Sequence, residues 1–414
     1  MNRDKTYFLL LNIGHFLGHL FMLLFATVAA LALYREWGTG YAELIAYATP
    51  GFFAFGFCSV PAGWLADRLS RDGMMCVFFV GIGAASILTS FASTPLQVGA
   101  GLLVIGMFAA IYHPVGLAIV SMKWRNTGMR IATNGVWGNL GVACAALLTG
   151  YMIDHAGWRM AFVLPGIFSI LIGVAYFVLQ RDSIRADGAK KAAADVAPAA
   201  PMTAAHRSLL VRVSIIVFVT AAVSSVIFQS TTFALPKMME ERLQGLAQYL
   251  TAIMNGLPQS ENGDTATVIG ALAFIVFAVA SFAQLVVGSL LDKHGPRKVF
   301  MVVATIQIVF FALMPGLTDA WALAVALGFM LGAFGQIPIS DFMIGKMASG
   351  AYRARAYAIR YVVSFTVLAS SLPMIAFVHS NWGFDRLFLI LAVAAAIILG
   401  VVTLLPKKLP TADG

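Results

Sequence analysis

The chain has 414 residues, of which 60% are apolar and only 11% are charged. A soluble globular chain carries about 25% charged residues, so this composition excludes large soluble domains and predicts an integral membrane protein. The apolar runs are continuous, which excludes a transmembrane β-barrel built from short alternating strands. The net charge of +9 comes from basic residues between the apolar runs. We attribute it to membrane topology and expect no nucleic-acid partner.

Twelve apolar stretches are each long enough for a transmembrane helix, which needs about 20 residues. The sequence therefore predicts an all-α membrane protein with twelve transmembrane helices. The predicted spans cover residues 7–33, 43–66, 73–93, 96–121, 130–153, 158–180, 209–236, 266–291, 298–317, 320–345, 355–378 and 385–406.

Two connections between spans are longer than the others. Residues 181–208 are rich in Ala, Pro and charge without apolar periodicity, which predicts a flexible linker. The linker separates an N-terminal six-helix bundle, residues 1–180, from a C-terminal six-helix bundle, residues 209–414. Residues 237–265 carry apolar side chains at spacings of three or four, which predicts an amphipathic segment on the outer membrane face. We favour packing over the ends of neighbouring spans for this segment, with ligand gating as the alternative.

The basic residues predict the orientation of the chain. With a cytoplasmic N-terminus, only Arg35, Arg159, Lys237, Arg242 and Arg386 of the 27 Lys and Arg residues fall outside, which leaves 22 inside. Loops rich in Lys and Arg stay on the cytoplasmic side. We therefore predict a multi-pass protein of the cytoplasmic (inner) membrane, with the linker and both termini cytoplasmic.

The two halves of the chain repeat. Three pairs of similar sequence occur in the same register at corresponding places in the two halves. The pairs are GWLADR at 63–68 with GSLLDK at 288–293, Pro114 with Pro338, and GWRMAF at 157–162 with GFDRLF at 383–388. Such parallel repeats predict two pseudo-symmetric bundles related by an axis along the membrane normal.

These repeated residues resemble the major facilitator superfamily, and the resemblance covers nearly the whole chain. The signature loop of that family, Gly-x-Leu-x-Asp-Arg/Lys with a basic tail, occurs in both halves, although in the first copy Ser70 replaces a usual Gly and Asp72 replaces a common basic residue. The resemblance implies that the loops hold the outward-open state, and simple topogenic charge is the alternative. The implied gating residues are Gly63, Asp67, Arg68, Arg71, Gly288, Asp292, Lys293 and Arg297. More narrowly, residues 111–114 and 135–141 resemble fosmidomycin-resistance-type bacterial carriers.

In that family the first, fourth, seventh and tenth spans line a central cavity, and three histidines of this chain fall on two of them. His15 and His19 lie four residues apart on one face of the first span. They suit an anionic substrate, a proton relay or a metal, and proton coupling is favoured over metal binding because imidazole titrates near neutral pH and no third ligand is fixed. A neutral pair bonded to neighbouring helices is the other alternative. His113 precedes Pro114 in the fourth span, where the proline frees a backbone carbonyl.

Other polar residues occur deep in the predicted spans. Gln229 and Gln336 are candidate substrate contacts, with bonding between helices as the alternative. Asp341 is the one carboxylate expected well inside a span, and a pair with Arg360 would form a cytoplasmic gate or a coupling site. In the fifth span, the small residues are expected to permit close helix packing. They are Gly135, Gly138 and Gly141.

The function predicted from these residues is secondary active transport of a small organic solute by alternating access, coupled to protons as symport or antiport. The chain has no phosphate-binding loop, which excludes an ATP-driven pump, and we expect no cofactor, no metal and no enzymatic activity. Cavity histidines with little negative charge favour a small organic anion or an amphipathic molecule over a polycation. A membrane sensor or scaffold without transport is the alternative. The expected partners are the substrate, protons and membrane lipid, and we expect a monomer.

Overall fold

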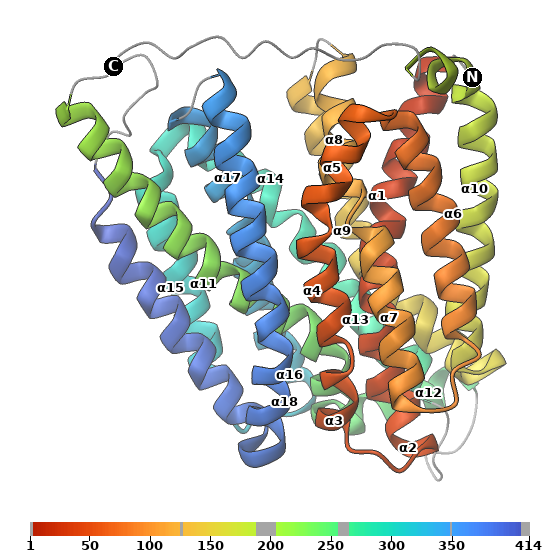
Figure 1. Cartoon of the computed structure of the whole chain (residues 1–414). Coiled ribbons are helices and arrows are strands. Elements are labelled where there is room, and N and C mark those ends of the chain that lie inside the picture. Colours follow the sequence, from red (N-terminus) through yellow and green to blue (C-terminus); the bar gives the residue numbers. More distant parts are fainter. Residues whose placement is uncertain (1–2, 125–126, 188–203, 256–264, 348–349, 407–414) are drawn as a thin grey trace. The chain divides into compact units, whose positions relative to one another are not determined.

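The computed structural model describes residues 3–124, 127–187, 204–255, 265–347 and 350–406. Within these ranges every regular element is a helix (Figure 1). Eleven stretches of the described chain are long and apolar enough to cross a membrane. The prediction of an all-α, multi-pass membrane protein is confirmed.

The chain folds into two compact units, which are described separately. Unit 1 comprises Met1–Ala192 and Phe233–Ala278, and unit 2 comprises Ala193–Thr232 and Val279–Gly414. The helices up to the linker are α1 (Arg3–Val28), the π-helical turn η1 (Ala29–Leu33), α2 (Tyr34–Glu36), α3 (Tyr41–Ala46), α4 (Thr49–Phe57), α5 (Ser59–Arg68), α6 (Arg71–Thr89), α7 (Pro95–Ala109), α8 (Tyr112–Lys123), α9 (Thr127–Ala156) and α10 (Trp158–Asp187). The later helices are α11 (Ala204–Arg242), α12 (Gln244–Asn255), α13 (Ala266–Ser281), α14 (Ala283–His294), α15 (Pro296–Leu313), α16 (Asp319–Gly335), α17 (Ile337–Met347) and α18 (Gly350–Thr403).

Corresponding spans of the two halves are broken at corresponding places. The second and eighth predicted spans form the broken pairs α4/α5 and α13/α14, and the fourth and tenth form α7/α8 and α16/α17. Pro61, Pro114 and Pro338 lie just after three of these four breaks. A proline ring clashes with the carbonyl four residues earlier and cannot donate a backbone hydrogen bond, so the helix is interrupted there. The repeat found in the sequence thus extends to the local backbone.

Two glycines at equivalent positions of the repeat adopt left-handed backbone angles. Gly157 has φ 82° directly before α10, and Gly383 has φ 71° inside α18. Only glycine adopts this region readily, so both positions turn the chain sharply. The eleventh and twelfth predicted spans are therefore two helical segments of α18 that meet at Gly383.

In unit 1, α1 packs along α9 and α6 packs along α10 (Figure 1). A Cβ atom on Gly141 would overlap the backbone of Phe16, and one on Gly138 would come within 2.8 Å of the His15 ring. The prediction that glycines of the fifth span permit close packing is confirmed for these two. It is wrong for Gly135, where the position of a Cβ atom is open space with nothing within 4 Å.

The two long connections differ in part from their predicted bounds. The predicted linker 181–208 begins as the end of α10 and ends as the start of α11, and residues 188–203 lie outside the described chain. Residues 237–242 of the predicted amphipathic segment continue α11, and α12 follows from Gln244. The helix extends past the predicted end of its span because the charged side chains there are paired, as described below. Residues 256–264 are outside the described ranges.

Candidate functional site

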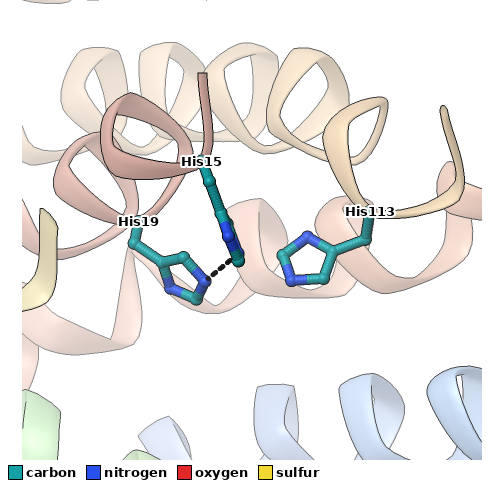
Figure 2. Close-up of side chains that lie close together, drawn as sticks. All are labelled: His15, His19 and His113. Carbon is teal, nitrogen blue, oxygen red and sulfur yellow. Dashed lines mark hydrogen bonds between the residues drawn. The ribbon is translucent and has the colours of Figure 1, made fainter. Parts of the chain in front are cut away.

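Three histidines of unit 1 lie together. His15 and His19 extend from α1, and His113 extends from α8 toward them (Figure 2). The Nε2 atoms of His15 and His19 are 3.1 Å apart, and the His113 ring centroid lies 5.3 Å from that of His15 and 5.5 Å from that of His19. One ring nitrogen of each residue lies within 4.8 Å of those of the other two. The pair on α1 was expected from spacing, and the fold adds the third imidazole.

The hydrogen bonds of His15 determine where its proton lies. Its Nδ1 atom is 2.7 Å from the backbone carbonyl oxygen of Asn134 on α9. A carbonyl oxygen can only accept, so Nδ1–H is the donor and the neutral ring carries its lone pair on Nε2. That lone pair accepts the Nε2–H of His19. The bond to the Asn134 carbonyl therefore turns the lone-pair nitrogen of His15 toward the other two histidines.

Tyr112, the residue before His113, packs against the histidine cluster and is itself held by hydrogen bonds. Its ring stacks on the His15 ring with centroids 4.8 Å apart and 15° between the planes. Its hydroxyl donates to the Leu11 carbonyl at 2.7 Å and accepts from Asn134 Nδ2 at 2.8 Å, and the same amide donates to Asn12 Oδ1 at 2.9 Å. Asn12, Tyr112 and Asn134 are buried. A buried, satisfied network of this kind holds its members in one arrangement.

The network residues were not predicted as site residues. Asn12 lies three residues before His15 on α1, a spacing that places both on one helix face. Tyr112 is adjacent to His113, and Asn134 precedes the glycine-rich run of α9. The helical spacing to His15 is a sequence signal that would have found Asn12. Contact between α1, α8 and α9 is a tertiary feature that sequence spacing does not contain.

Small residues leave room for the aromatic rings of the cluster. A Cβ atom on Gly14 or on Gly116 would lie 2.9 Å from the ring of Tyr112, and one on Gly138 would lie 2.8 Å from Nε2 of His15. These approaches are closer than side-chain carbon atoms tolerate, so the packing of the two rings requires glycine at all three positions.

We expect Gly138→Ala to displace the His15 ring and to lower the free energy of unfolding by about 1–3 kcal/mol, as overpacking of a tight core does. Gly135→Ala is the matched control on the same helix, because a Cβ atom there meets nothing within 4 Å. Thermal unfolding of the two variants in detergent, followed by intrinsic fluorescence, measures the difference. Equal unfolding temperatures would show that the His15 ring is not confined as described.

The predicted site residues of unit 2 do not form a comparable cluster among the described side chains. Gln229 is buried on α11, and Gln336 is buried at the break between α16 and α17. Nε2 of Gln336 donates to the Ser224 carbonyl on α11 at 3.2 Å, which is the bond between helices that the sequence left as an alternative. Asp341 is half-buried on α17. The side chain of Arg360 lies outside the described residues, so its pairing with Asp341 stays a prediction.

The first signature loop is organised by local contacts. Asp67 pairs with Arg71 at 2.7 Å, and the Arg68 guanidinium lies 4.1 Å from the Trp64 ring centroid. A Cβ atom on Gly63 would lie 3.3 Å from Pro114, so this glycine permits a close approach of α5 to α8. The predicted gating role of these residues stays a prediction.

The second signature loop is more open. Asp292 and Lys293 are exposed, Arg297 is half-buried in the first turn of α15, and none of the three forms an ion pair within the described ranges. A Cβ atom on Gly288 would meet no described atom within 4 Å. The predicted gating role of Gly288, Asp292, Lys293 and Arg297 stays a prediction.

A buried ion network in unit 1 was missed from the sequence. Lys237 and Glu240 near the end of α11 pair at 2.6 Å, and each side chain is 8% exposed. Glu240 also accepts from the Arg35 guanidinium at 2.8 Å and from the Tyr34 hydroxyl at 2.7 Å. Lys237 was assigned to the outer side of the membrane, at the start of the predicted amphipathic segment. The i,i+3 spacing of Lys237 and Glu240 was the available signal.

A second buried carboxylate, Asp72, was noted only as a departure from the family pattern. Its Oδ1 atom accepts from the hydroxyls of Tyr7 and Tyr176, both at 2.6 Å, and its Oδ2 atom accepts from Ser183 at 2.7 Å. Asp72 lies in the first turn of α6, where the helix dipole also favours negative charge. The hydroxyl donors on α1 and α10 therefore explain why an acidic residue, rather than the basic residue common in the family, suits position 72.

Comparison with known proteins gives a family and a set of distant relatives. The sequence model of the Major Facilitator Superfamily matches residues 11–260 and 243–413. The probable actinorhodin transporter of Streptomyces coelicolor is 30% identical over 158 residues, 36% of this chain and 26% of that protein. The gallate transporter of Pseudomonas putida is 25% identical over 183 residues, 44% of this chain and 39% of that protein. These two matches span well under half of either relative.

A longer match joins the chain to the 4-hydroxybenzoate transporter PcaK of Pseudomonas putida, with 24% identity over 335 residues, 78% of this chain and 72% of that protein. Among solved structures, a POT family transporter in complex with 5-aminolevulinic acid has a TM-score of 0.73 at 14% identity, covering 98% of this chain and 96% of that chain. The nucleoside transporter NupG has a TM-score of 0.70 at 16% identity, covering 96% and 99%. At these identities the two structures show the fold alone.

Proposed function

Because the chain belongs to the major facilitator superfamily, we propose that it is a secondary active transporter. It moves a small organic acid across the cytoplasmic membrane by alternating access, with both termini in the cytoplasm. It works as a monomer, and a proton gradient drives it.

The observation that carries the proposal is the three-histidine cluster of α1 and α8. The groups that meet there are His15, His19 and His113, with Tyr112 stacked on His15. His19 and His113 are half-buried, so a solute can reach them, whereas His15 is buried at 7% exposure. Imidazole N–H groups donate hydrogen bonds that a carboxylate accepts. The cluster therefore suits an anion.

The names of two relatives agree with this chemistry. 4-Hydroxybenzoate and gallate, the substrates in those names, are small aromatic acids. A stacked aromatic and imidazole surface beside hydrogen-bond donors suits the ring and the carboxylate of such a molecule. We therefore assign substrate binding to the three histidines of unit 1, and Gln229 and Gln336 of unit 2 stay candidate substrate contacts of their own unit.

Proton coupling is assigned to Asp341. It is a half-buried carboxylate on α17, within the span Asp319–Ile344. A carboxylate in such a position exchanges a proton as its surroundings change between the two states of a carrier. Arg360 is its proposed partner, and the Asp67–Arg71 and Asp292–Arg297 regions latch one state.

The test uses the purified full chain in sealed proteoliposomes with radiolabelled 4-hydroxybenzoate. We expect counterflow exchange of the label and, with an imposed inward proton gradient, accumulation above equilibrium. In Asp341→Asn, exchange should persist while gradient-driven accumulation is lost. Asp319→Asn is the matched control at the other end of the same span, since asparagine tolerates the positive φ of 47° there.

Different results would contradict the proton-coupling assignment and the transport function. Gradient-driven accumulation in Asp341→Asn at the level of the unchanged chain would contradict the coupling assignment. Folded protein that exchanges no organic acid in a panel of aromatic and aliphatic acids would contradict transport and favour the sensor or scaffold alternative.

A further inference from the structure

We propose that His15, His19 and His113 form a binding site for one divalent transition-metal ion of the zinc class. The sequence left metal binding aside because the pair on α1 lacked a third ligand. The fold supplies that ligand from α8, 94 residues after His19 in the chain.

The nitrogen positions are close to those that an ion needs. Zn–N bonds of about 2.0–2.1 Å in a tetrahedral site place neighbouring nitrogens about 3.3 Å apart. The Nε2 atoms of His15 and His19 are 3.1 Å apart, and binding an ion requires His19 to carry its proton on Nδ1, so that its Nε2 lone pair replaces the N–H donated to His15. The His113 nitrogen lies within 4.8 Å of both, and its ring points toward them (Figure 2). To complete the set, the half-buried His113 side chain has to rotate and bring its nitrogen to about 3.3 Å from the other two.

The surroundings of His15 resemble those of a metal ligand. Histidines that bind metals almost always donate their other ring N–H to a carbonyl or carboxylate, which fixes the ring orientation. His15 donates Nδ1–H to the Asn134 carbonyl at 2.7 Å and leaves Nε2 as the lone-pair nitrogen. Tyr112 and Gly138 hold the two sides of the ring in place. The ligand is thus oriented before any ion arrives.

The donor set selects a class of ion. Three imidazole nitrogens with no thiol or carboxylate in the group suit Zn²⁺, Co²⁺, Ni²⁺ or Cu²⁺, whereas Mg²⁺ and Ca²⁺ require oxygen ligands. Three protein ligands also leave one tetrahedral position for an exogenous ligand. If the proposed function holds, the carboxylate of the substrate has the chemistry to occupy that position.

Cobalt(II) is the probe, because a tetrahedral Co²⁺ ion gives intense visible absorption bands. The full chain carries a tag without histidines, is stripped with a chelator and is titrated with Co²⁺ in detergent. We expect one Co²⁺ per chain, displaced by Zn²⁺ and unaffected by Mg²⁺. His15→Gln and His113→Gln should each weaken binding at least about 100-fold, more than the 10–100-fold typical of a lost outer-shell partner. His155→Gln on α9, an exposed histidine outside the cluster, is the matched control.

A second variant guards against loss of folding. His113→Cys replaces one nitrogen ligand with a thiolate, so a folded protein should still bind Co²⁺ and should gain a sulfur-to-metal charge-transfer band. The three native cysteines are free thiols, so each measurement is repeated with Cys58→Ser, Cys76→Ser and Cys144→Ser combined.

Tetrahedral Co²⁺ binding that is lost in both glutamine variants and kept in His155→Gln establishes the site. Absence of stoichiometric binding, or binding unchanged by His113→Gln, overturns it. The result is independent of flux. Exchange of organic acids without metal binding refutes the metal site alone, and metal binding by a chain that exchanges no acid refutes the proposed transport alone.

Discussion

Glu240→Ala is expected to lower the free energy of unfolding by about 3–5 kcal/mol, because removing one partner of a buried ion pair leaves the other charge uncompensated. Lys237 and Glu240 are each 8% exposed and 2.6 Å apart. The Tyr34 hydroxyl and the Arg35 guanidinium also lose their acceptor. The network joins the end of α11 to the end of the first span, so its loss loosens both.

The exposed Glu43 on α3 is the control, and Glu43→Ala should change stability by less than about 0.5 kcal/mol, as surface substitutions do. The double variant Lys237→Met with Glu240→Leu should recover most of the loss, since apolar residues of similar volume replace buried ion pairs at little or no penalty. Unfolding in detergent against denaturant or temperature gives these values. Equal stabilities of Glu240→Ala and Glu43→Ala would disprove the burial of the network.

Asp72→Ala should lower the free energy of unfolding by about 3 kcal/mol or more. Hydrogen bonds to a charged group contribute about 1.5–3 kcal/mol each, and Asp72 accepts from Tyr7, Tyr176 and Ser183. The two tyrosine rings are fully buried, so their hydroxyls find no water in its place. Asp72→Asn keeps an acceptor oxygen but loses the charge, and it should fall between the alanine variant and the unchanged chain.

Asp182→Ala provides the comparison for this second substitution. Asp182 lies 3.8 Å from Arg181 with 68% of its side chain exposed, so its removal should leave the free energy of unfolding nearly unchanged. The variants are measured side by side in the same detergent. If Asp72→Ala and Asp182→Ala have the same free energy of unfolding, the carboxylate of Asp72 does not hold α1, α6 and α10 together.

Much of the architecture was readable from the sequence because the bilayer imposes strong local rules. Long apolar runs must become helices, since lipid offers no hydrogen-bond partner to an open backbone. The breaks at Pro114 and Pro338 follow from the ring and missing N–H of proline, and the turns at Gly157 and Gly383 follow from the freedom of glycine to adopt a positive φ. These features depend on neighbours within a few residues, which the sequence displays directly.

The buried charges could not be read in the same way. Asp72 and Glu240 lie near the ends of predicted spans, where a charged residue ordinarily reaches water or a lipid headgroup. Each is buried because distant segments converge on it: Tyr7 and Tyr176 on Asp72, and Arg35 on Glu240. A charge near a span end carries no local sign of such partners, so the sequence analysis gave neither residue a buried partner.

The candidate site also has features that local sequence predicts and features that only helix packing determines. The sequence by itself determined a helical, twice-repeated membrane chain and placed His15 and His19 on one helix face, because helical periodicity is a local property. Only the tertiary structure brought His113 and Tyr112 of α8, and the Asn134 carbonyl of α9, to His15. Those contacts join residues about a hundred positions apart. They depend on how glycines such as Gly138 let three helices approach, and helix packing decides that rather than helix formation.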